Sequence, residues 1–491
     1  MSLAEVRSCV RSGVSGQPVG VQAHLASGLP RVAILGSTDV AVNEARDRVR
    51  SAIVNSGFTW PDARITVSLA PATTSKRGAG LDVAVAIAVL VADEQIEPVG
   101  DAILVGELGL DGSIRSVPGA IAMSHGLDRD SPGTVFVPAA DAGVWAWSRS
   151  RRVVPVTSLT ELVDWLRRPE RQVEAPRRRL CEEPSPVGAD MSDVVGQPAA
   201  VRAALTAAAG RHHILFTGPP GVGKSMLAHR LAGLLPALSP DEALESAAVA
   251  EACGDEVRLS TRVPFQTPHH SASHVAMVGS ARGTEVQPGL ISRSHRGVLV
   301  LDEAPEFRRE TLESLRQPLE SGSITVARAG VTAQLPACFQ LVATANPCPC
   351  GQHGARDGDC RCPALSVQRY EARLSAPLLD RIDINLRLDR PRSTQPAPPT
   401  TELAERVVRA RECARERWPQ LASTMTPCGP GDPATLPEAV RTFLEQERWR
   451  RRGGGERRHA AAVRLTWTLA ALDGCESPSL EHASDALRLR G

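Results

Sequence analysis

Residues 213–231 read HILFTGPPGVGKSMLAHRL, and this stretch decides the fold of the chain around it. An apolar, strand-like run leads directly into the glycine-rich loop 218–223, and a helical pattern begins after it. Backbone N–H groups of such a loop, together with the N-terminus of the following helix, bind a phosphate group. The stretch therefore predicts a P-loop in an α/β fold, with a parallel sheet covered by helices on both faces.

The loop and the first helical residues are the expected nucleotide contacts. The chain has 56 lysine and arginine residues, but only two are lysines, Lys76 and Lys224. The ammonium group of Lys224 is expected to reach the β- and γ-phosphates of ATP, and the hydroxyl of Ser225 to bind Mg²⁺. The complete set of predicted nucleotide-binding residues is Gly218, Pro219, Pro220, Gly221, Val222, Gly223, Lys224, Ser225 and Met226.

Two further strand-like runs end in polar residues. GVLVLDEAPEF (297–307) places Asp302 and Glu303 after four apolar residues, and QLVATANPC (340–348) is a similar run that ends in the polar residues Thr344 and Asn346. Parallel sheets carry their ligands at the carboxyl ends of the strands. We therefore expect Asp302 to hold Mg²⁺, Glu303 to orient the attacking water, and Asn346 to contact the γ-phosphate or that water.

A later segment, LSAPLLDRIDI (374–384), contains Arg381. An arginine supplied by a partner subunit stabilises the charge that develops during phosphoryl transfer. Arg381 is therefore a predicted arginine finger that acts on a neighbouring subunit, and the alternative interpretation is a surface helix cap. Arg464, near the C-terminus, is a second predicted catalytic arginine, acting within its own subunit.

Composition divides the chain into four segments. Residues 1–166 mix strand-like and helical runs, 167–190 are rich in charge and proline, 191–395 hold the nucleotide-binding core, and 396–491 are helical in pattern. We expect an α+β domain, an exposed linker, an α/β core and a helical lid, in that order. The expected strands are 32–35, 65–69, 103–105, 135–137, 214–217, 298–301 and 339–343, with a hairpin at 323–336 turning at Gly330; the expected helices are 40–55, the apolar run after Gly80, 401–418 and 460–472.

The overall composition is that of a globular protein. Of the 491 residues, 42% are hydrophobic and 23% charged, which excludes disorder along the whole chain. The longest apolar run, 83–92, is about half the length of a bilayer span, and the N-terminus lacks the apolar stretch of a secretory signal. We therefore expect a cytoplasmic protein with no membrane partner. A net charge of +1 argues against coating nucleic acid by bulk charge, but leaves a local basic channel open.

Four of the eleven cysteines fall within fifteen residues, 348–362. Cys348 and Cys350 form one pair, Cys360 and Cys362 a second, and the loop between the pairs is rich in glycine, aspartate and arginine. Four thiolates satisfy a tetrahedral zinc ion, so we expect structural Zn²⁺ here. The alternatives are four reduced thiols, or His353 replacing one of the ligands.

Several motifs together resemble the magnesium-chelatase-like branch of AAA+ ATPases, and within it the ComM/YifB family. The matching segments are DVVGQ (193–197), GPPGVGKSMLA (218–228), PHHSAS (268–273), HRGVLVLDEAPEF (295–307), ATANPCPCG (343–351) and RLSAPLLDRIDI (373–384). The resemblance assigns Lys224 and Ser225 to Walker A and Asp302 and Glu303 to Walker B. It also assigns Asn346 to sensor 1, Arg381 to the arginine finger and Arg464 to sensor 2.

Members of this family are hexameric ATPases that drive branch migration of DNA junctions, during natural transformation where that occurs. The resemblance therefore implies a homo-hexamer that uses ATP and Mg²⁺ and acts as a helicase or branch-migration motor on branched or single-stranded DNA. Two alternatives stay open: a magnesium-chelatase-type ATPase subunit, and a nucleotide-switched scaffold that binds partners without processive work.

The N-terminal segment resembles the Lon-protease-like domain of the same family. GAGLDVAVAIAVL (78–90) and GELGLDGSIRSVPGA (106–120) carry that resemblance. Gly78 stands where the nucleophilic serine of a Lon protease is expected, and residues 120–124 supply no lysine base. We therefore expect a domain without peptidase activity, and the Lon-like resemblance and Cys348–Cys362 cluster argue against the chelatase alternative.

The residues before the second predicted core strand form an insert that is longer than a nucleotide fold needs. It contains His269, His270, His274 and Arg282, and the predicted hairpin that follows carries Arg328. Such insertions line the pore of AAA+ rings, where phosphate contacts give salt-sensitive binding without sequence preference. The alternative is that each histidine forms local hydrogen bonds within a loop.

Overall fold

A computed structural model of the chain describes residues 2–36, 40–71, 80–127, 133–147, 151–168, 170–171, 175–182, 189–255, 257, 259–282, 285–328, 331–354, 360–391, 393–421, 428–450 and 455–491. The chain divides into two compact units. Unit 1 is Met1–Cys181 with Ala247–Leu259 and Arg282–Val286, and unit 2 is Glu182–Ser246, Ser260–Ala281 and Gln287–Gly491. Gly78 and Gly330, which the sequence analysis singled out, lie outside the described residues.

Unit 1 is built on a mixed sheet of order β3-β4-β2-β1-β5-β8-β9. Its strands are β1 (Ser2–Ser12), β2 (Ser15–Ala26), β3 (Arg31–Leu35), β4 (Arg64–Ala70), β5 (Ile103–Leu104), β8 (Gly133–Pro138) and β9 (Arg151–Val156), and a separate small pair is β6 (Glu107–Leu108) and β7 (Ile114–Arg115). The helices are α1 (Val40–Asn55), α2 (Asp82–Ala92), α3 (Ala120–Gly126), α4 (Ala142–Trp145) and α5 (Leu159–Leu166). The unit is an α+β domain, as predicted.

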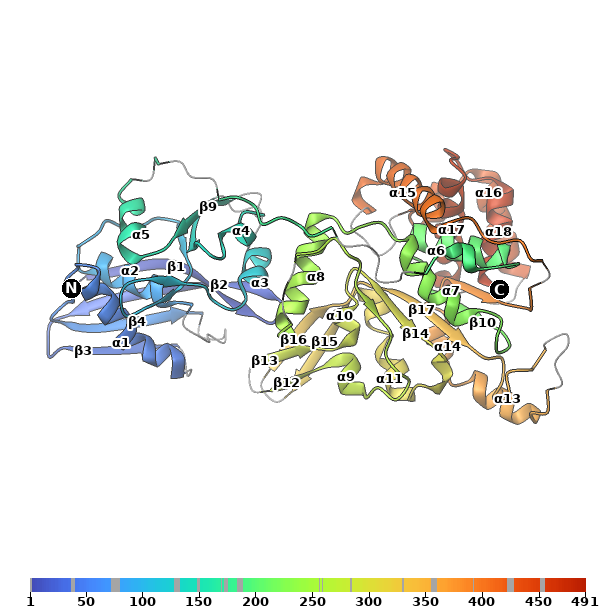
Figure 1. The fold of residues 1–491 in the computed structure, drawn as a ribbon, viewed down its shortest axis with the longest axis horizontal. Coiled ribbons are helices and arrows are strands. Elements are labelled where there is room, and N and C mark those ends of the chain that lie inside the picture. Colours follow the sequence, from blue (N-terminus) through green and yellow to red (C-terminus); the bar gives the residue numbers. More distant parts are fainter. Residues whose placement is uncertain are drawn as a thin grey trace. The chain divides into compact units, whose positions relative to one another are not determined.

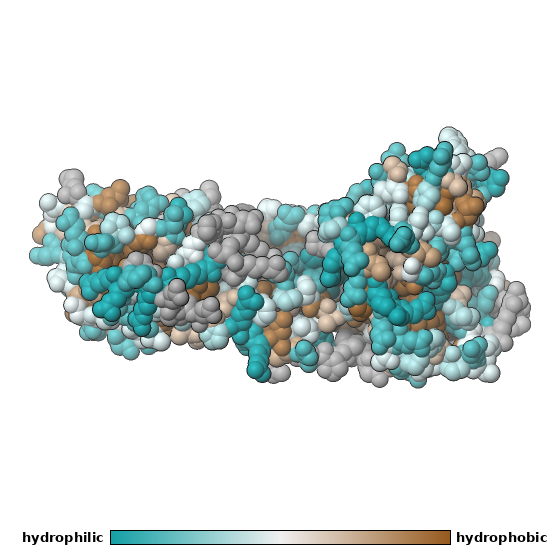
Figure 2. All heavy atoms as spheres, turned by 90° about the horizontal axis from the view of Figure 1, so that it is seen from above, coloured by the Kyte–Doolittle hydropathy of each residue, from teal (hydrophilic) through white to brown (hydrophobic). Residues whose placement is uncertain are grey.

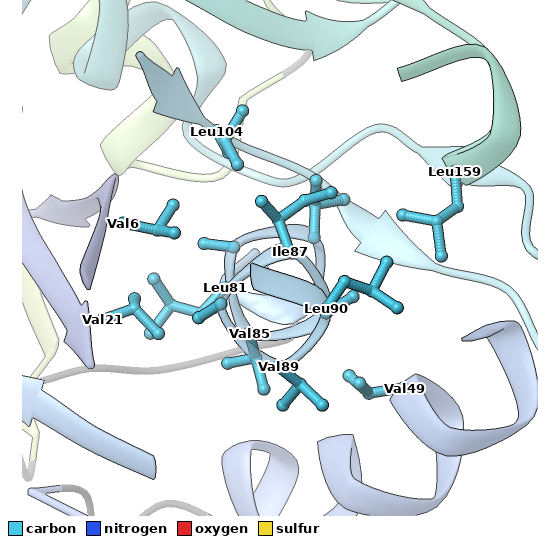
Figure 3. Close-up of a cluster of buried hydrophobic side chains, with 14 of the residues drawn as sticks. Val6, Val21, Val49, Leu81, Val85, Ile87, Val89, Leu90, Leu104 and Leu159 are labelled. Carbon is cyan, nitrogen blue, oxygen red and sulfur yellow. The ribbon is translucent and has the colours of Figure 1, made fainter. Parts of the chain in front are cut away.

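Helix α2 is the centre of the unit 1 core. Ten of its eleven residues are buried, because the sequence DVAVAIAVLVA is apolar on every side. Figure 3 shows side chains from β1, β2, α1, β5 and α5 around it, including Val6, Val21, Val49, Leu104 and Leu159. The apolar run that is too short to span a membrane is therefore a buried core helix.

Strands β1 and β2 form the longest hairpin of the described chain, and the sequence analysis missed it. They pair from Ser2↔Leu25 to Ser12↔Ser15, which leaves the two-residue turn Gly13-Val14. Residues 4–8 alternate between buried and exposed, and Gly13 has φ +63°, as the first position of a tight hairpin turn requires. Alternation followed by a glycine turn was the signal that predicts this hairpin.

Unit 2 is built on a parallel sheet of order β11-β14-β17-β10-β18. Its strands are β10 (Ile214–Thr217), β11 (Phe265–Gln266), β14 (Val298–Leu301), β17 (Gln340–Ala345) and β18 (Ile384–Arg387). Figure 1 shows β10, β14 and β17 side by side. All four residues of β14 and all six of β17 are buried, as in strands covered on both faces. The predicted α/β fold with a parallel sheet is confirmed.

The helices that follow residue 197 fall into two sets. Those near the sheet and in the loops between its strands are α6 (Pro198–Gly210), α7 (Lys224–Leu231), α8 (Pro240–Ala252), α9 (His274–Val278), α10 (Leu290–Arg293), α11 (Arg309–Ser314), α12 (Pro318–Ser321), α13 (Ala364–Glu371) and α14 (Ala376–Leu379). The C-terminal set is α15 (Thr400–Arg417), α16 (Glu438–Arg450), α17 (Glu456–Leu472) and α18 (Leu480–Arg490), which gather together in Figure 1. This C-terminal region is helical, as predicted.

Smaller elements complete the chain. Short 3₁₀ helices are Met191–Asp193, Ala232–Leu234, Ala304–Glu306, Pro419–Leu421 and Pro433–Thr435, and two hairpins are β12 (Gly279–Arg282) with β13 (Glu285–Pro288) and β15 (Ser323–Arg328) with β16 (Val331–Pro336). The strands of the predicted hairpin at 323–336 are therefore present. Figure 2 shows hydrophilic residues over much of one face, with apolar residues in smaller groups between them. Among the described residues, no helix combines the length and apolar character needed to cross a membrane.

Candidate nucleotide site

Three strands of the parallel sheet bring the predicted site residues to one edge. Thr217, the last residue of β10, pairs with Ala345 of β17, and Leu301, the last residue of β14, pairs with Ala343. The loops that follow these strands therefore leave the sheet at the same edge, where α/β sheets bind ligands. They are the P-loop 218–223, the acidic pair 302–303, and the segment that begins at 346.

The P-loop ends at the start of α7, whose N-cap is Gly223. This residue has φ +92°, a left-handed conformation that L-residues with a side chain rarely adopt. A glycine is therefore required at the point where the loop turns into the helix. The free N–H groups of the first helical turn then face the space that a phosphate would occupy.

Lys224 is the buried cation of the site. The residue is 8% exposed, and its Nζ donates hydrogen bonds to Gly218 O (2.8 Å), Pro219 O (2.9 Å) and Asn346 Oδ1 (3.0 Å). Burial lowers the pKa of Lys224, and the nearby carboxylates of Asp302 and Glu303 partly oppose that change. The structure thus brings two predicted catalytic residues, Lys224 and Asn346, into direct contact.

Asp302 lies at the centre of a second set of contacts. Its Oδ1 accepts hydrogen bonds from Ser225 Oγ (2.8 Å) and from Thr344 Oγ1 (2.6 Å). The same Thr344 hydroxyl accepts a hydrogen bond from the backbone N–H of Glu303 (2.9 Å), whose side chain is exposed. Thr344 was not among the predicted site residues, although its position at the end of a buried strand was the signal.

The Ser225 and Asp302 oxygens fit a magnesium ion. Mg²⁺ prefers hard oxygen ligands and in nucleotide sites takes one or two protein ligands, keeping waters and phosphate oxygens for the rest. A hydroxyl and a carboxylate that already touch each other beside the P-loop offer that set. Residues 225 and 302 are therefore chemically suited to hold Mg²⁺ next to a bound nucleotide.

Arg381 lies in the loop after α14, and its described contacts are with other residues of its own chain. Its Nη1 donates to Pro377 O (2.7 Å), and its Nη2 pairs with the carboxylate of Glu320 on α12. Arg457, in the first turn of α17, pairs with the other oxygen of the same carboxylate. Two arginines from different parts of unit 2 thus meet at Glu320, and the sequence analysis did not single out Arg457.

Arg464 reaches a different acid. Its Nη2 donates to Asp383 Oδ1 (3.1 Å), and the other oxygen of Asp383 contacts His212 Nδ1 (3.1 Å). Burial alone would raise the pKa of Asp383, but the hydrogen bond with His212 and the charge of Arg464 hold that pKa well below its ordinary value. The structure therefore ties Arg464 to a buried carboxylate, and its described hydrogen bonds do not include Lys224 or Asn346.

The four clustered cysteines come together in space. Their sulfur atoms all lie within 4.8 Å of one another, with Cys348 3.4 Å from Cys350 and 3.8 Å from Cys360. The N–H of Gln352 and the neighbouring thiols lower the pKa of Cys350 to about 6. The backbone N–H of His353 donates to Cys348 Sγ (3.3 Å). Tetrahedral coordination with each sulfur about 2.3 Å from the ion places the sulfurs about 3.8 Å apart, so the spacing of these four sulfurs fits Zn²⁺.

The residues predicted to touch nucleic acid are only partly described. His269, His270 and His274 are exposed, and the rings of the first two lie with centroids 4.1 Å apart. His269 Nδ1 contacts Ser271 Oγ (2.8 Å), which is the local hydrogen bond of the alternative interpretation. The side chains of Arg282 and Arg328 lie outside the described residues.

Comparisons with known proteins cover nearly the whole chain. Residues 190–395 match the family model described as magnesium chelatase, subunit ChlI; residues 397–490 match its C-terminal model; and residues 21–141 match a model described as subunit ChlI of Mg-chelatase. The expected likeness of the N-terminal segment to Lon protease therefore stays a prediction.

Three relatives show how far the similarity extends. A protein of Mycobacterium tuberculosis is 41% identical over 509 residues, covering 100% of this chain and 99% of its own. The protein YifB of Escherichia coli is 41% identical over 439 residues, covering 86% and 84%. Competence protein ComM of Haemophilus influenzae is 35% identical over 505 residues, covering 100% and 98%.

The Thr344 hydroxyl should matter for turnover more than for binding. Thr344→Val keeps the shape of this buried side chain but removes the bonds to Asp302 and to the Glu303 N–H. Because both acids lose a positioning partner, we expect ATP turnover to fall about 10- to 100-fold while ATP binding changes little. Steady-state hydrolysis and equilibrium binding of a fluorescent ATP analogue measure the two effects. Thr344→Ser keeps the hydroxyl and is the control; equal turnover in both variants would contradict this role.

The P-loop edge and the full-length relatives lead to the same assignment. A parallel sheet, a phosphate loop and a C-terminal set of helices form the AAA+ module, and the similarity extends over 98% of ComM and 84% of YifB. The chain belongs to the ComM/YifB family of magnesium-chelatase-like AAA+ ATPases.

Proposed function

We propose that this AAA+ ATPase is a cytoplasmic motor that assembles as a ring of six copies and remodels branched or single-stranded DNA. Branch migration, or a related helicase activity, in recombination or natural transformation is the proposed task. The observation that carries this proposal is the similarity over 98% of the length of a protein named for competence, ComM. The arrangement of site residues supports the ATP-dependent part.

The proposed catalytic roles follow from the contacts at the sheet edge. Lys224 binds the β- and γ-phosphates of ATP. Its hydrogen bonds to Gly218 O, Pro219 O and Asn346 Oδ1 hold the ammonium group at the phosphate loop. Ser225 and Asp302 hold Mg²⁺, which when bound neutralises charge on the phosphates. The exposed carboxylate of Glu303 orients and deprotonates the attacking water, and the Asn346 amide contacts that water or the γ-phosphate.

Arg381 supports assembly into a ring. Its described contacts are Pro377 and Glu320, and none is with the P-loop or with the acids 302 and 303 of its own chain. A half-exposed carboxylate is an exchangeable partner for a guanidinium, so a phosphate of a neighbouring subunit can replace it. We therefore assign Arg381 to the site of the next copy. Arg457 shares Glu320 and is the lid arginine linked to this finger. Arg464 keeps its proposed sensor 2 role within its own subunit, and its hydrogen bond to Asp383 attaches α17 to the segment before β18.

DNA would contact the β15–β16 hairpin and the exposed histidines 269, 270 and 274. Contacts of this kind are to phosphates and give binding without sequence preference. The chelatase alternative is supported by the family descriptions, all three of which name subunit ChlI. The scaffold alternative is weakened by Glu303, because a switch without turnover does not need an acid beside the attacking water.

The response of ATP hydrolysis to DNA separates these three functions. We expect a four-way junction to stimulate steady-state hydrolysis more than single strands, and single strands more than linear duplex. Lys224→Ala is the blank, because it removes the cation of the phosphate site. Hydrolysis that depends on Lys224 but is equal with and without every DNA would contradict the motor and favour the chelatase or scaffold alternative.

Mixing two inactive variants tests whether Arg381 acts across subunits. An Arg381→Ala copy keeps its own P-loop, and a Lys224→Ala copy keeps its finger, so each can supply what the other lacks. In an equal mixture about one quarter of the interfaces would be complete, and we expect activity up to about that fraction of the unmodified protein. If the mixture is no more active than the two variants alone, Arg381 does not complete a neighbouring site.

We further propose that Cys348, Cys350, Cys360 and Cys362 hold one structural Zn²⁺. Metal analysis of protein purified without added zinc should find about one equivalent, since four thiolates complete the coordination of the ion. A Cys348→Ser/Cys362→Ser variant should lose it. A Cys413→Ser/Cys475→Ser variant changes two exposed cysteines elsewhere and should keep it. Folded, active protein that contains no metal would contradict the zinc site.

A further inference from the structure

The loop that carries the four cysteines packs directly on the P-loop. Gly351 follows Cys350, and a β-carbon added to it would lie 2.5 Å from Cδ of Pro220, too close for any real contact. The backbone of the cysteine loop therefore lies against the Pro220 ring with no room for a side chain between them. Pro220 is the third residue of the phosphate loop, and α7 begins four residues later.

A second contact attaches the same loop to β18, the strand that pairs with β10. Arg387, the last residue of β18, donates from Nη2 to His353 O (3.0 Å). In the sheet, Arg387 pairs with Thr217, the residue that directly precedes the P-loop. The cysteine loop therefore contacts both the P-loop that follows β10 and the end of the strand that pairs with β10.

The cysteine loop also begins at the nucleotide site. Asn346, whose Oδ1 accepts the hydrogen bond from Lys224, lies two residues before Cys348. Cys348 is completely buried, and its backbone oxygen accepts from the N–H of Gly351 (2.9 Å). The segment 346–351 therefore runs from the Lys224 contact to the Pro220 contact, with the two cysteines 348 and 350 inside it.

Helices and strands contribute little to holding this loop in place. Described residues 347–354 and 360–363 contain turns and bends but no helix or strand. The first pair of cysteines lies in the part that touches the P-loop, and the second pair lies just before α13 begins at Ala364. A metal ion bound by all four thiolates would link the P-loop contact to α13, and metal binding in such a segment stabilises its folded conformation.

We propose that the ion held by these four thiolates braces the P-loop, so that occupancy of the cysteine site controls the affinity for ATP. The inference rests on the zinc site proposed above and adds a role for it. With the ion bound, residues 346–351 hold Pro220 and Asn346 in the arrangement that binds phosphate. Without the ion, residues 346–351 are free to move, and the P-loop loses the packing contact between Gly351 and Pro220. The ligand class is a soft or borderline divalent ion such as Zn²⁺.

Equilibrium binding of a fluorescent ATP analogue to the full chain, with Mg²⁺ and without DNA, tests this. The ion is removed from the unmodified protein with a mercurial reagent and a chelator, dithiothreitol then restores the thiols, and Zn²⁺ is added back. Cys350 is exposed and Cys360 and Cys362 are partly exposed, so the reagents can reach them. We expect the dissociation constant to rise at least about tenfold without the ion, since small displacements of a binding loop have effects of this size, and to recover with Zn²⁺.

Variants separate the brace from general damage to the fold. Cys360→Ser/Cys362→Ser should bind the analogue as weakly as the stripped protein and should not respond to Zn²⁺, whereas Cys413→Ser/Cys475→Ser should behave as the unmodified protein. Gly351→Ala places a methyl group against Pro220 and should weaken binding while the metal content stays at one equivalent. Circular dichroism before and after stripping verifies that the fold is retained.

The outcomes distinguish this inference from the proposals it rests on. Complete, reversible loss of metal with a dissociation constant that changes less than twofold would overturn the brace and leave the zinc site intact. Absence of metal from the purified protein would overturn both. The assay contains no DNA and measures no turnover, so failure of the DNA motor would leave its result unaffected.

Discussion

The buried ammonium group of Lys224 is the constraint on which the nucleotide site depends. An ammonium has three donors, and here all three are used: by the carbonyls of Gly218 and Pro219 and by the amide oxygen of Asn346. These acceptors are neutral dipoles, and the carboxylates of Asp302 and Glu303 act on the ammonium from nearby. Because a buried charge is costly unless it is hydrogen-bonded and paired, a phosphate that takes the place of a neutral acceptor would give Lys224 a direct ionic partner.

That arrangement requires the parallel register of three strands. Asn346 can reach Lys224 only because β17 pairs with β10 so that Ala345 lies opposite Thr217. Asp302 can reach Ser225 because β14 pairs with the other side of β17. Thr344 connects β17 to the acidic pair that follows β14, since its hydroxyl donates to Asp302 and accepts from the N–H of Glu303. A one-residue slip between any two strands would turn these side chains to the opposite face. The all-buried β14 and β17 make such a slip costly, so the core of unit 2 also fixes the chemistry of its edge.

The sequence predicts those parts of the molecule that are encoded locally. The P-loop is one continuous stretch of sequence. Each neighbouring strand is a buried apolar run that ends in a polar residue, so the positions of the P-loop and of these strands could be predicted from the sequence. The cysteine pairs have a spacing that brings four sulfurs together, and they do lie within 4.8 Å of one another. The β1–β2 hairpin was also encoded locally, by alternation and the turn at Gly13, although the sequence analysis did not predict it.

Partners that depend on tertiary packing could not be predicted. Nothing in the sequence near Arg457 indicates that it shares Glu320 with Arg381, because the two arginines are separated by most of the helical C-terminal region. The same holds for Arg464 with Asp383 and for Pro220 with Gly351. In the first two cases one partner lies in a loop next to the sheet and the other lies on α17, whereas Pro220 and Gly351 lie in two different loops. The spacing of residues along the sequence therefore does not predict such contacts.

Glu320 shows what the proposed ring requires of Arg381. Its side chain is 50% exposed, and an ion pair at that exposure contributes about 1 kcal/mol or less. Arg381 itself is 11% exposed and already points toward Glu320, so its conformational entropy has largely been lost before any neighbour arrives. Exchange of this carboxylate for a phosphate therefore costs little in broken contacts and little in ordering. An arginine held in this way is available to a neighbouring subunit without being free in solution, which is the property that a residue completing another copy's site requires.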